Sequence, residues 1–197
     1  MDKHERQRRL EELVREILEL TGDDPLREGL LETPSRIARM LLDEMCSGSN
    51  VTEEQLIQEV KVFRDESVAG QFVAVRDVSF SSTCEHHGLP FFGTAAVVYI
   101  PNGKGMISGL SKVARVLDKI AARNQVQERI TAQLFGVLQK AVEPSALLVF
   151  LDASHQCMTC RGVKKTESRT STLKFGGLFE SDHALRHDAL SLLRRAA

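Results

Sequence analysis

The sequence lacks a long hydrophobic run, a large net charge and a glycine-rich phosphate loop, and each absence narrows the class of protein. No apolar stretch in the 197 residues approaches the roughly 18 residues that a membrane-spanning helix needs. The charged N-terminal residues lead into no apolar signal core, so we expect a cytoplasmic protein that does not bind membranes. A formal net charge of −1 gives no general attraction to nucleic acid, so local clusters must hold any anionic ligand.

Cysteine is also scarce, with four residues in the chain. In a reducing cytoplasm, cysteines more often bind metals or take part in catalysis than form disulfides. The hydrophobic content of 42% is ordinary for a globular protein, and the length is sufficient for one hydrophobic core.

Residues 1–62 predict a helical region that precedes the rest of the chain. Apolar residues recur there at helical spacing among charged residues. Thr33 followed by Pro34 predicts a helix with the threonine as N-cap, and Thr52 begins a capping-box pattern. The expected helices cover 4–20, 33 to about 45, and a shorter stretch that starts at 52.

Residues 63–197 have the pattern of a catalytic domain that is rich in strands. Two strands come first, then two helices, then two strands, which indicates an α+β fold with an antiparallel sheet. The expected strands cover 72–80, 91–100, 146–153 and 166–175. The expected helices cover 110–122, 126–142 and a last segment that Ser181 and Asp182 cap and that reaches Arg195.

The densest group of metal-ligating side chains follows an apolar run. Cys84, His86 and His87 lie within four positions, and His155 and Cys157 follow a later strand. Zinc favours cysteine sulfur and histidine nitrogen in a tetrahedral site. If the later strand continues, side chains two positions apart share a face, so His155 points the same way as Cys157. We interpret Cys84, His87 and Cys157 as three ligands of a catalytic zinc with an open position for water. His86 and His155 would then move protons beside the ion.

Cys160 supports a competing interpretation. A closed structural zinc site would use Cys84, His87, Cys157 and Cys160, and would belong to a binding module without catalytic activity. Cys157 and Cys160 also have the spacing of a redox pair. On a continuing strand Cys160 would face away from Cys157, and no helix is expected at the position that a redox motif requires. These arguments favour the catalytic site and leave the closed site as an alternative.

Two further motifs carry polar side chains at predicted helix starts. Lys112 and Arg115 lie three positions apart on one helical face, next to Ser111, where an anion would be favoured. Taken alone, that pattern is better explained by a solvated basic face. Gln127 and Glu128 place an amide beside a carboxylate, a pair that can hold N1 and the exocyclic amine of guanine. An ordinary polar helix start is the alternative there.

In this order, these motifs resemble the GTP cyclohydrolase I family. The resemblance covers about residues 24–187, and it rests on Glu32–Arg36, Thr83–His87, Gly109–Lys112, Gln125–Arg129, His155–Cys157 and Arg161–Gly162. That family hydrolyses the imidazole ring of GTP at C8, releases formate and rearranges the ribose to give 7,8-dihydroneopterin triphosphate. This reaction is the first step toward folate and related pterins. The resemblance implies a tunnelling fold whose antiparallel sheet is backed by two helices, and one Zn2+ per subunit. It also implies a homodecamer of two pentamers with active sites at subunit interfaces.

The resemblance also implies a role for each matching residue. The implied zinc ligands are Cys84, His87 and Cys157. The implied proton-transfer residues are His86 and His155. The implied substrate contacts are Gln127 and Glu128 to guanine with Ser111 in the same pocket, and Lys112, Arg115, Arg161, Arg36 and Arg39 to the triphosphate. A cysteine at position 160 departs from the family's pattern. A tunnelling-fold enzyme that acts on another pterin or a deazaguanine is the remaining alternative, and it would keep Glu128 without needing the three zinc ligands.

Overall fold

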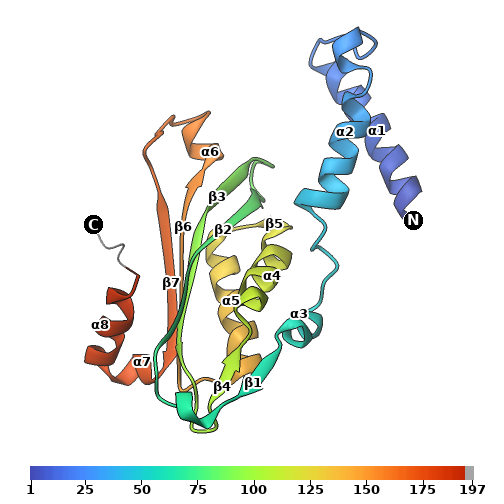
Figure 1. Ribbon diagram of the computed structural model, residues 1–197. Coiled ribbons are helices and arrows are strands. Elements are labelled where there is room, and N and C mark those ends of the chain that lie inside the picture. Colours follow the sequence, from blue (N-terminus) through green and yellow to red (C-terminus); the bar gives the residue numbers. More distant parts are fainter. Residues whose placement is uncertain (194–197) are drawn as a thin grey trace. The chain divides into compact units, whose positions relative to one another are not determined.

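The computed structural model describes residues 1–193 as two compact units, one covering Met1–Ser47 and the other beginning at Gly48 (Figure 1). In the described part of the chain, every helix is too short or too polar to cross a membrane. The predicted division of the chain at residue 62 into a helical region and a catalytic domain stays a prediction.

The first unit is helical. Its elements are α1 (Lys3–Leu20), η1 (Glu28–Leu30), α2 (Thr33–Arg39) and the π-helix η2 (Met40–Met45). Asp2 caps α1, because its side chain accepts a hydrogen bond of 2.9 Å from the backbone N–H of Glu5. Val14 and Ala38 are buried within this unit.

The second predicted helix differs from expectation at both ends. Thr33 is the first helical residue and not the N-cap, which is Glu32 and makes no side-chain capping bond. The α-helix gives way to a π-helix before Met45. The backbone N–H of Cys46 there donates to the carbonyl of Leu41, five residues back, which widens the turn.

A five-stranded sheet in the order β5-β2-β3-β6-β7 forms the centre of the second unit (Figure 1). Its strands are β2 (Val73–Cys84), β3 (Pro90–Ile100), β5 (Asn124–Gln125), β6 (Ala146–His155) and β7 (Thr170–Gly177). Neighbours pair antiparallel, except for the short β5, which runs parallel to β2. Phe91 pairs with His155, so the β2–β3 turn and the C-terminal end of β6 lie at the same end of the sheet.

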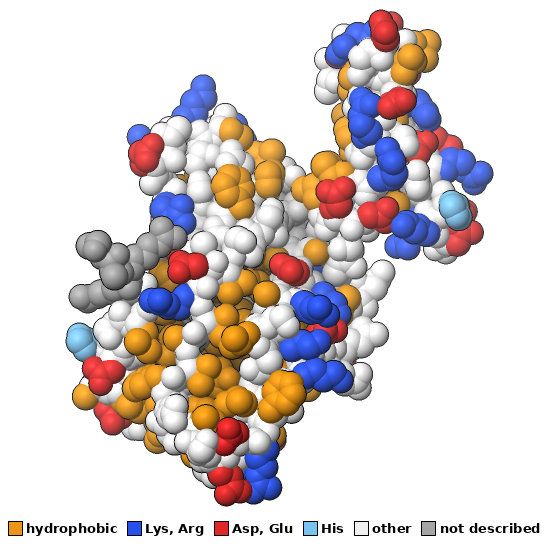
Figure 2. Space-filling view, in the orientation of Figure 1, with side chains coloured by type: hydrophobic (Ala, Val, Ile, Leu, Met, Phe, Trp, Pro, Cys, Tyr) orange, Lys and Arg blue, Asp and Glu red, His pale blue; other side chains and the backbone are white. Residues whose placement is uncertain are grey.

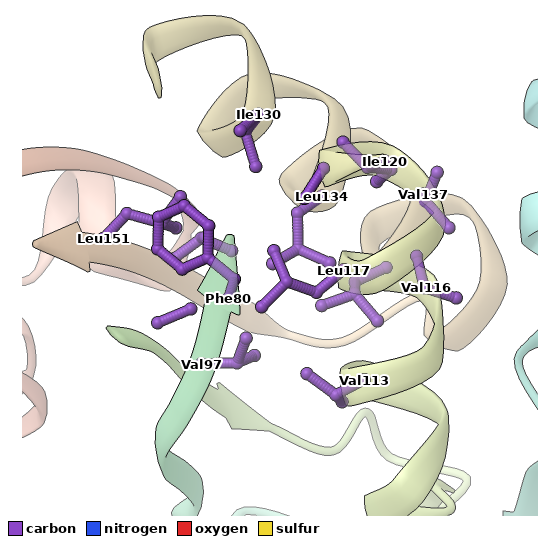
Figure 3. Packing of buried hydrophobic residues seen from close by; sticks show 14 of the residues in the cluster. Phe80, Val97, Val113, Val116, Leu117, Ile120, Ile130, Leu134, Val137 and Leu151 are labelled. Atoms are coloured by element: carbon purple, nitrogen blue, oxygen red, sulfur yellow. The ribbon is translucent and has the colours of Figure 1, made fainter. Parts of the chain in front are cut away.

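Two long helices, α4 (Leu110–Ala121) and α5 (Gln127–Val142), cover one face of this sheet (Figure 1). Leu117 and Ile120 of α4 meet Leu134 of α5 and Phe80 of β2 in the main hydrophobic core (Figure 3). Both helices have apolar residues at helical spacing, so each presents one apolar stripe to the sheet. Burial of that surface, at about 25 cal/mol per Å², is the main favourable term that holds helices and sheet together.

Shorter helices lie against the other face of the sheet. They are α7 (Leu178–Ser181) and α8 (His183–Ser191), and they bury Phe179 and Ala189 with Val98 and Leu148 of the sheet. Asp182 caps α8 by accepting a hydrogen bond of 2.9 Å from the N–H of Leu185, as its position in the sequence predicts.

Several smaller elements complete the second unit. They are α3 (Glu53–Glu59), β1 (Val62–Arg64), the 3-10 helix η3 (Glu66–Val68), β4 (Met106–Ser108) and α6 (Gln156–Thr159). The predicted capping box is confirmed, since Thr52 and Gln55 exchange both hydrogen bonds at the start of α3. The antiparallel pair β1–β4 is absent from the sequence prediction, because three-residue strands leave too short a pattern to detect.

The α+β class, with a largely antiparallel sheet backed by two helices, is confirmed. Several further bounds were wrong, among them that of the strand expected over 72–80, which runs from Val73 to Cys84. The strand expected from residue 166 begins at Thr170, and the last helix ends at Ser191, with Leu192 and Leu193 in a turn. Residue 195, the expected end of that helix, lies outside the described residues. The strand expected near Cys157 ends at His155, and the chain turns there into α6.

Candidate functional site

A tight turn between β2 and β3 holds the first half of the candidate metal site. Cys84 is the last residue of β2, and its carbonyl accepts hydrogen bonds from the N–H groups of His87 and Gly88 at 3.3 and 2.9 Å. Gly88 has a φ of +66°, a conformation that side chains other than glycine disfavour. This turn folds the chain back after three residues, so Cys84 and His87 approach one another.

Cys157 supplies the second half from α6, the helical turn that follows β6. The Cys84 sulfur, a His87 ring nitrogen and the Cys157 sulfur all lie within 4.8 Å of one another. Zinc bonds to sulfur and nitrogen are about 2.0–2.3 Å long, so small side-chain movements would let one ion bind all three atoms. The expectation that His155 and Cys157 share a strand face was wrong, because the strand ends at His155.

The donor set and its surroundings fit a zinc ion. Cys84 is buried, Cys157 is half-buried and His87 is exposed, so the cluster opens toward solvent on the histidine side. Burial, together with the neighbouring Cys84 thiol, raises the pKa of the Cys157 thiol, and the charge of Arg161 opposes this. A divalent cation would reverse the effect by binding the deprotonated sulfur atoms.

Cys160 lies outside this cluster. Its thiol is exposed and donates a hydrogen bond of 3.0 Å to the carbonyl of Gln156, at the end of α6. A closed four-ligand site is therefore not formed by the described residues. The reason given for excluding Cys160 was wrong, because a helical turn and not a continuing strand separates Cys160 from Cys157.

The two histidines predicted to transfer protons lie in different places. His86 lies beside the metal cluster, and His155 is the last residue of β6, the strand that leads to Cys157. The Nδ1 atom of His86 is 3.9 Å from the Cys84 sulfur, and its ring meets that of His87 edge to face. His155 ends β6 and stacks on Phe91, with ring centroids 4.4 Å apart and planes 4° from parallel. Burial lowers the pKa of His155, and the nearby charge of Glu128 partly offsets this. The direction of this shift favours the neutral imidazole.

The start of α5 lies next to these residues. Residues 124 and 125 form β5, which pairs with the last two residues of β2, and α5 begins two residues later. Gln127 is buried, and its side-chain oxygen is 2.9 Å from the Nε2 atom of His155. Glu128 is exposed, so its carboxylate is accessible to a ligand.

An ion pair that sequence reasoning missed joins the metal-site turn to α5. Arg129 donates two hydrogen bonds to the carboxylate of Glu85, of 2.5 and 3.0 Å. This contact lowers the pKa of Glu85. The backbone N–H of Glu85 also donates to the carbonyl of Gln125 at 3.0 Å. Partners 44 residues apart have no recognisable spacing, so only the fold could reveal this pair.

Of the predicted phosphate-binding residues on α4, Lys112 lies at the opposite end of that helix from the metal cluster. Ser82 donates a hydrogen bond of 2.7 Å to the carbonyl of Ala121, which fixes the C-terminal end of α4 near Cys84. Ser111 lies ten residues earlier, a distance of roughly 15 Å along an α-helix. Lys112 shares that distant end and Arg115 lies near the middle of α4, so the helix places Lys112 well away from the cluster.

Lys112 is paired in this structure. Its ammonium nitrogen is 3.2 Å from one carboxylate oxygen of Glu59, and that of Lys119 is 2.8 Å from the other. Hydrogen bonds from Lys119 and Lys112 lower the pKa of Glu59 to about 2. These three side chains and Lys61 line a surface cavity of about 390 Å³.

The other predicted cations are exposed. Arg161 follows α6, close enough to Cys157 to influence its pKa. Arg36 lies on α2 in the first unit and pairs with Glu32 at 3.0 Å. Arg36 and Arg39 line a shallow cavity of about 590 Å³ on that unit.

Comparison with known proteins identifies similar chains over nearly the whole length. The profile of the family described as GTP cyclohydrolase I matches residues 10–194. The protein named GTP cyclohydrolase 1 of Clostridioides difficile is 47% identical over 185 residues, covering 94% of this chain and 95% of that protein. The protein of the same name from Brevibacillus brevis is 45% identical over 186 residues, covering 94% and 96%. A crystal structure of the archaeosine synthase QueF-Like in the apo form aligns with 54% of this chain and 93% of its own, at 15% identity and a TM-score of 0.44.

Proposed function

The chain belongs to the GTP cyclohydrolase I family, and on that premise we propose that it opens the imidazole ring of GTP at C8. The products are formate and, after rearrangement of the ribose, 7,8-dihydroneopterin triphosphate. The observation that carries the proposal is the meeting of Cys84, His87 and Cys157 beside a histidine and an accessible carboxylate. We expect the reaction to take place in the cytoplasm and to begin the synthesis of folate or related pterins.

In this proposal, Cys84, His87 and Cys157 hold one zinc ion per subunit. When bound, zinc acts as a Lewis acid and makes water a competent nucleophile near neutral pH. The residues present supply two sulfur atoms and one nitrogen, the donors that zinc prefers. Because Cys160 lies outside the cluster, a fourth protein ligand is not proposed.

The two nearby histidines move protons during ring opening. The water that adds at C8 loses a proton and the departing ring nitrogen must receive one, so an imidazole that accepts the first proton can deliver the second. His86 is 3.9 Å from the Cys84 sulfur, and His155 is held in place by its stack on Phe91. We assign proton transfer to both, with His155 the better fixed of the two.

Glu128 recognises the guanine base. Its exposed carboxylate can accept hydrogen bonds from N1–H and the exocyclic amine of guanine together. Adenine N1 carries a lone pair and no hydrogen, so the carboxylate of Glu128 would receive no hydrogen bond from it. A mismatch of that kind costs about 1–3 kcal/mol, which favours GTP over ATP.

The triphosphate meets Lys112, Arg115 and Arg161, with Arg36 and Arg39 as further cations and Ser111 in the same pocket. Since Lys112 lies at the distant end of α4, we propose that Lys112, together with Arg115 on the same helical face, acts on a substrate bound to the metal site of another subunit. In this way each pocket would draw residues from two chains.

We propose a ring-shaped homodecamer of two pentamers on the family resemblance, and two surface features of the second unit support association with another chain. Among the described strands β7 is paired on one side only, which leaves a free edge for another chain. Exposed apolar side chains such as Phe92 and Leu173 lie on the sheet, and hydrophobic side chains gather over much of the visible surface of the second unit (Figure 2). Surfaces of this kind commonly mark protein contacts.

The direct test is incubation of the zinc-loaded protein with GTP. We expect one formate per GTP consumed, and a product that becomes a fluorescent pterin on oxidation. ATP and the metal-stripped protein are the controls, and the stripped protein should keep its circular dichroism spectrum. Absence of formate, or unfolding on removal of the metal, would contradict the proposal and favour a structural zinc site.

A further inference from the structure

Gln127 has a polar side chain that is buried in the interior of the second unit. It is the first residue of α5 and only 1% exposed, as buried as the leucines around it. The family resemblance assigns it to guanine, yet its buried amide is already bonded to protein groups. A buried amide in a core is retained when its hydrogen bonds are satisfied, so the identity of its partners shows what it does.

The NH₂ group of the Gln127 side chain has three acceptors around it. It lies 3.2 Å from the carbonyl oxygen of Leu151, 2.9 Å from that of Thr170 and 3.2 Å from the hydroxyl of Thr172. Carbonyl oxygens can only accept, so the nitrogen must face them. A flipped amide would bring oxygen against oxygen at two of these contacts.

A chain of hydroxyl groups fixes the same orientation independently. Thr131 donates its hydroxyl proton to the backbone carbonyl of Gln127 at 3.1 Å. The Thr131 and Thr172 hydroxyls are 2.6 Å apart, and Thr131 has no second proton, so Thr172 must donate to Thr131. The oxygen of Thr172 is then free to accept from the Gln127 amide.

The Gln127 side-chain oxygen therefore points to His155, whose Nε2 atom is 2.9 Å away. An amide oxygen can only accept, so the proton of this bond must lie on Nε2. A neutral imidazole carries one N–H, which leaves a lone pair on Nδ1. Within residues 1–193 no hydrogen bond is found at Nδ1, and the stack on Phe91 fixes the plane of the ring.

We propose that Gln127 is a positioning residue that fixes His155 as the Nε2–H tautomer and presents Nδ1 as the proton-accepting atom of the site. This inference rests on the proposed proton-transfer role of His155. It replaces the predicted side-chain contact of Gln127 with guanine and leaves base recognition to Glu128. The partner of one ring nitrogen sets the chemistry of the other, as in many histidine sites.

The chain contains a matched control for this role. Gln125 is also 1% exposed, and its side-chain NH₂ group donates to the carbonyl of Ile120 and to the side-chain oxygen of Gln133, at 3.1 and 2.8 Å, while its own side-chain oxygen accepts from Arg129 at 3.3 Å. It does not bond to His155. Gln127→Leu and Gln125→Leu therefore remove the same group from equally buried positions, and only the first removes the hydrogen bond to the imidazole.

Kinetics separate positioning from base recognition. We expect Gln127→Leu to lower kcat about 10- to 100-fold, the usual cost of removing such a supporting group, with KM for GTP changed less than about twofold. Gln125→Leu should keep kcat within about threefold of the wild type. A rise in KM with kcat preserved would overturn the proposal and return Gln127 to the guanine site.

Nitrogen NMR of the zinc-loaded full chain, labelled with ¹⁵N-histidine, tests the tautomer directly and does not depend on activity. His155→Gln identifies the signals of His155. At a pH of about 8.5, above the ordinary histidine pKa of about 6.5, we expect a protonated Nε2 and an unprotonated Nδ1 in the wild type and in Gln125→Leu. In Gln127→Leu that preference should be lost.

A proton on Nδ1 in the wild-type protein would overturn the proposal even if Gln127→Leu fails to fold. The expected tautomer in a protein without cyclohydrolase activity would support the positioning by Gln127 while rejecting the proposed function. The two failures are therefore distinguishable.

Discussion

The sulfur atoms of Cys84 and Cys157 lie within 4.8 Å of each other, although β3 lies between the strands that lead to them. Cys84 ends β2, and Cys157 lies two residues beyond the end of β6. The core consists of apolar side chains from the sheet, α4 and α5, with Cys84 among them and Cys157 packed against it. Because most of these apolar contacts do not involve the two sulfur atoms, we expect the fold to persist when the metal is removed.

Replacing Cys157 with serine should remove zinc and turnover together. A serine oxygen is a much poorer zinc ligand than a thiolate, and two protein ligands do not hold the ion firmly. We expect zinc content to fall at least about tenfold, measured by elemental analysis, while the circular dichroism spectrum is unchanged. Cys160→Ala is the matched control and should keep one zinc per subunit. Zinc loss in that variant would favour the closed four-ligand site instead.

Two inactive variants should restore activity when their subunits mix. Cys157→Ser lacks the metal half of the pocket and Lys112→Ala lacks the phosphate half, and the proposed pocket takes these halves from different chains. In a random mixed assembly about a quarter of the pockets would then receive both intact halves, because each half is intact in one subunit of two. The measurement is formate release by the co-expressed pair at low GTP. Activity no greater than the sum of the separate variants would place both halves in one chain.

Replacing Glu128 with glutamine should weaken GTP recognition without affecting the fold. The amide nitrogen would face donors on guanine, and a mismatch of about 1–3 kcal/mol corresponds to a loss of roughly 5- to 150-fold in kcat/KM. Glu143→Gln, at the opposite end of α5, is the control and should retain wild-type kinetics. Unchanged GTP kinetics in Glu128→Gln would exclude the carboxylate from base recognition.

The Glu59 ion pairs should make stability depend on pH in acid. The folded pKa of Glu59 is about 2, below its ordinary value of 4.5, because Lys119 and Lys112 stabilise the carboxylate. Such a group stabilises the fold above its unfolded pKa, and that contribution is lost as pH falls through the folded pKa. The difference in free energy of unfolding between wild type and Glu59→Gln should therefore shrink from pH 4.5 to 2.

Urea denaturation at several pH values measures this difference. Glu167→Gln changes an exposed carboxylate that makes no ion pair with residues 1–193, and it should retain the wild-type pH dependence. A constant difference between wild type and Glu59→Gln over this range would mean that the lysines do not stabilise the folded protein through Glu59.

The sequence alone determined the features that depend on neighbours in the chain. The capping box at Thr52, the cap at Asp182 and the order of strands and helices all follow from local hydrogen bonds or local apolar periodicity, and the structure contains them. The residue types at Cys84, His87 and Cys157 were sufficient to predict a zinc site, because few side chains bind zinc, and the structure brings these three side chains together.

Only the tertiary structure decided which distant groups share hydrogen bonds. The partners of Gln127, the pairing of Glu85 with Arg129 and the distance of Lys112 from the metal cluster depend on how β5, α4 and α5 dock against the sheet. The turn of the chain into α6 is set in the same way, and a strand pattern that ends at His155 could not reveal it. Periodicity records which face of an element is buried, whereas contacts between elements are fixed by packing that no local pattern encodes.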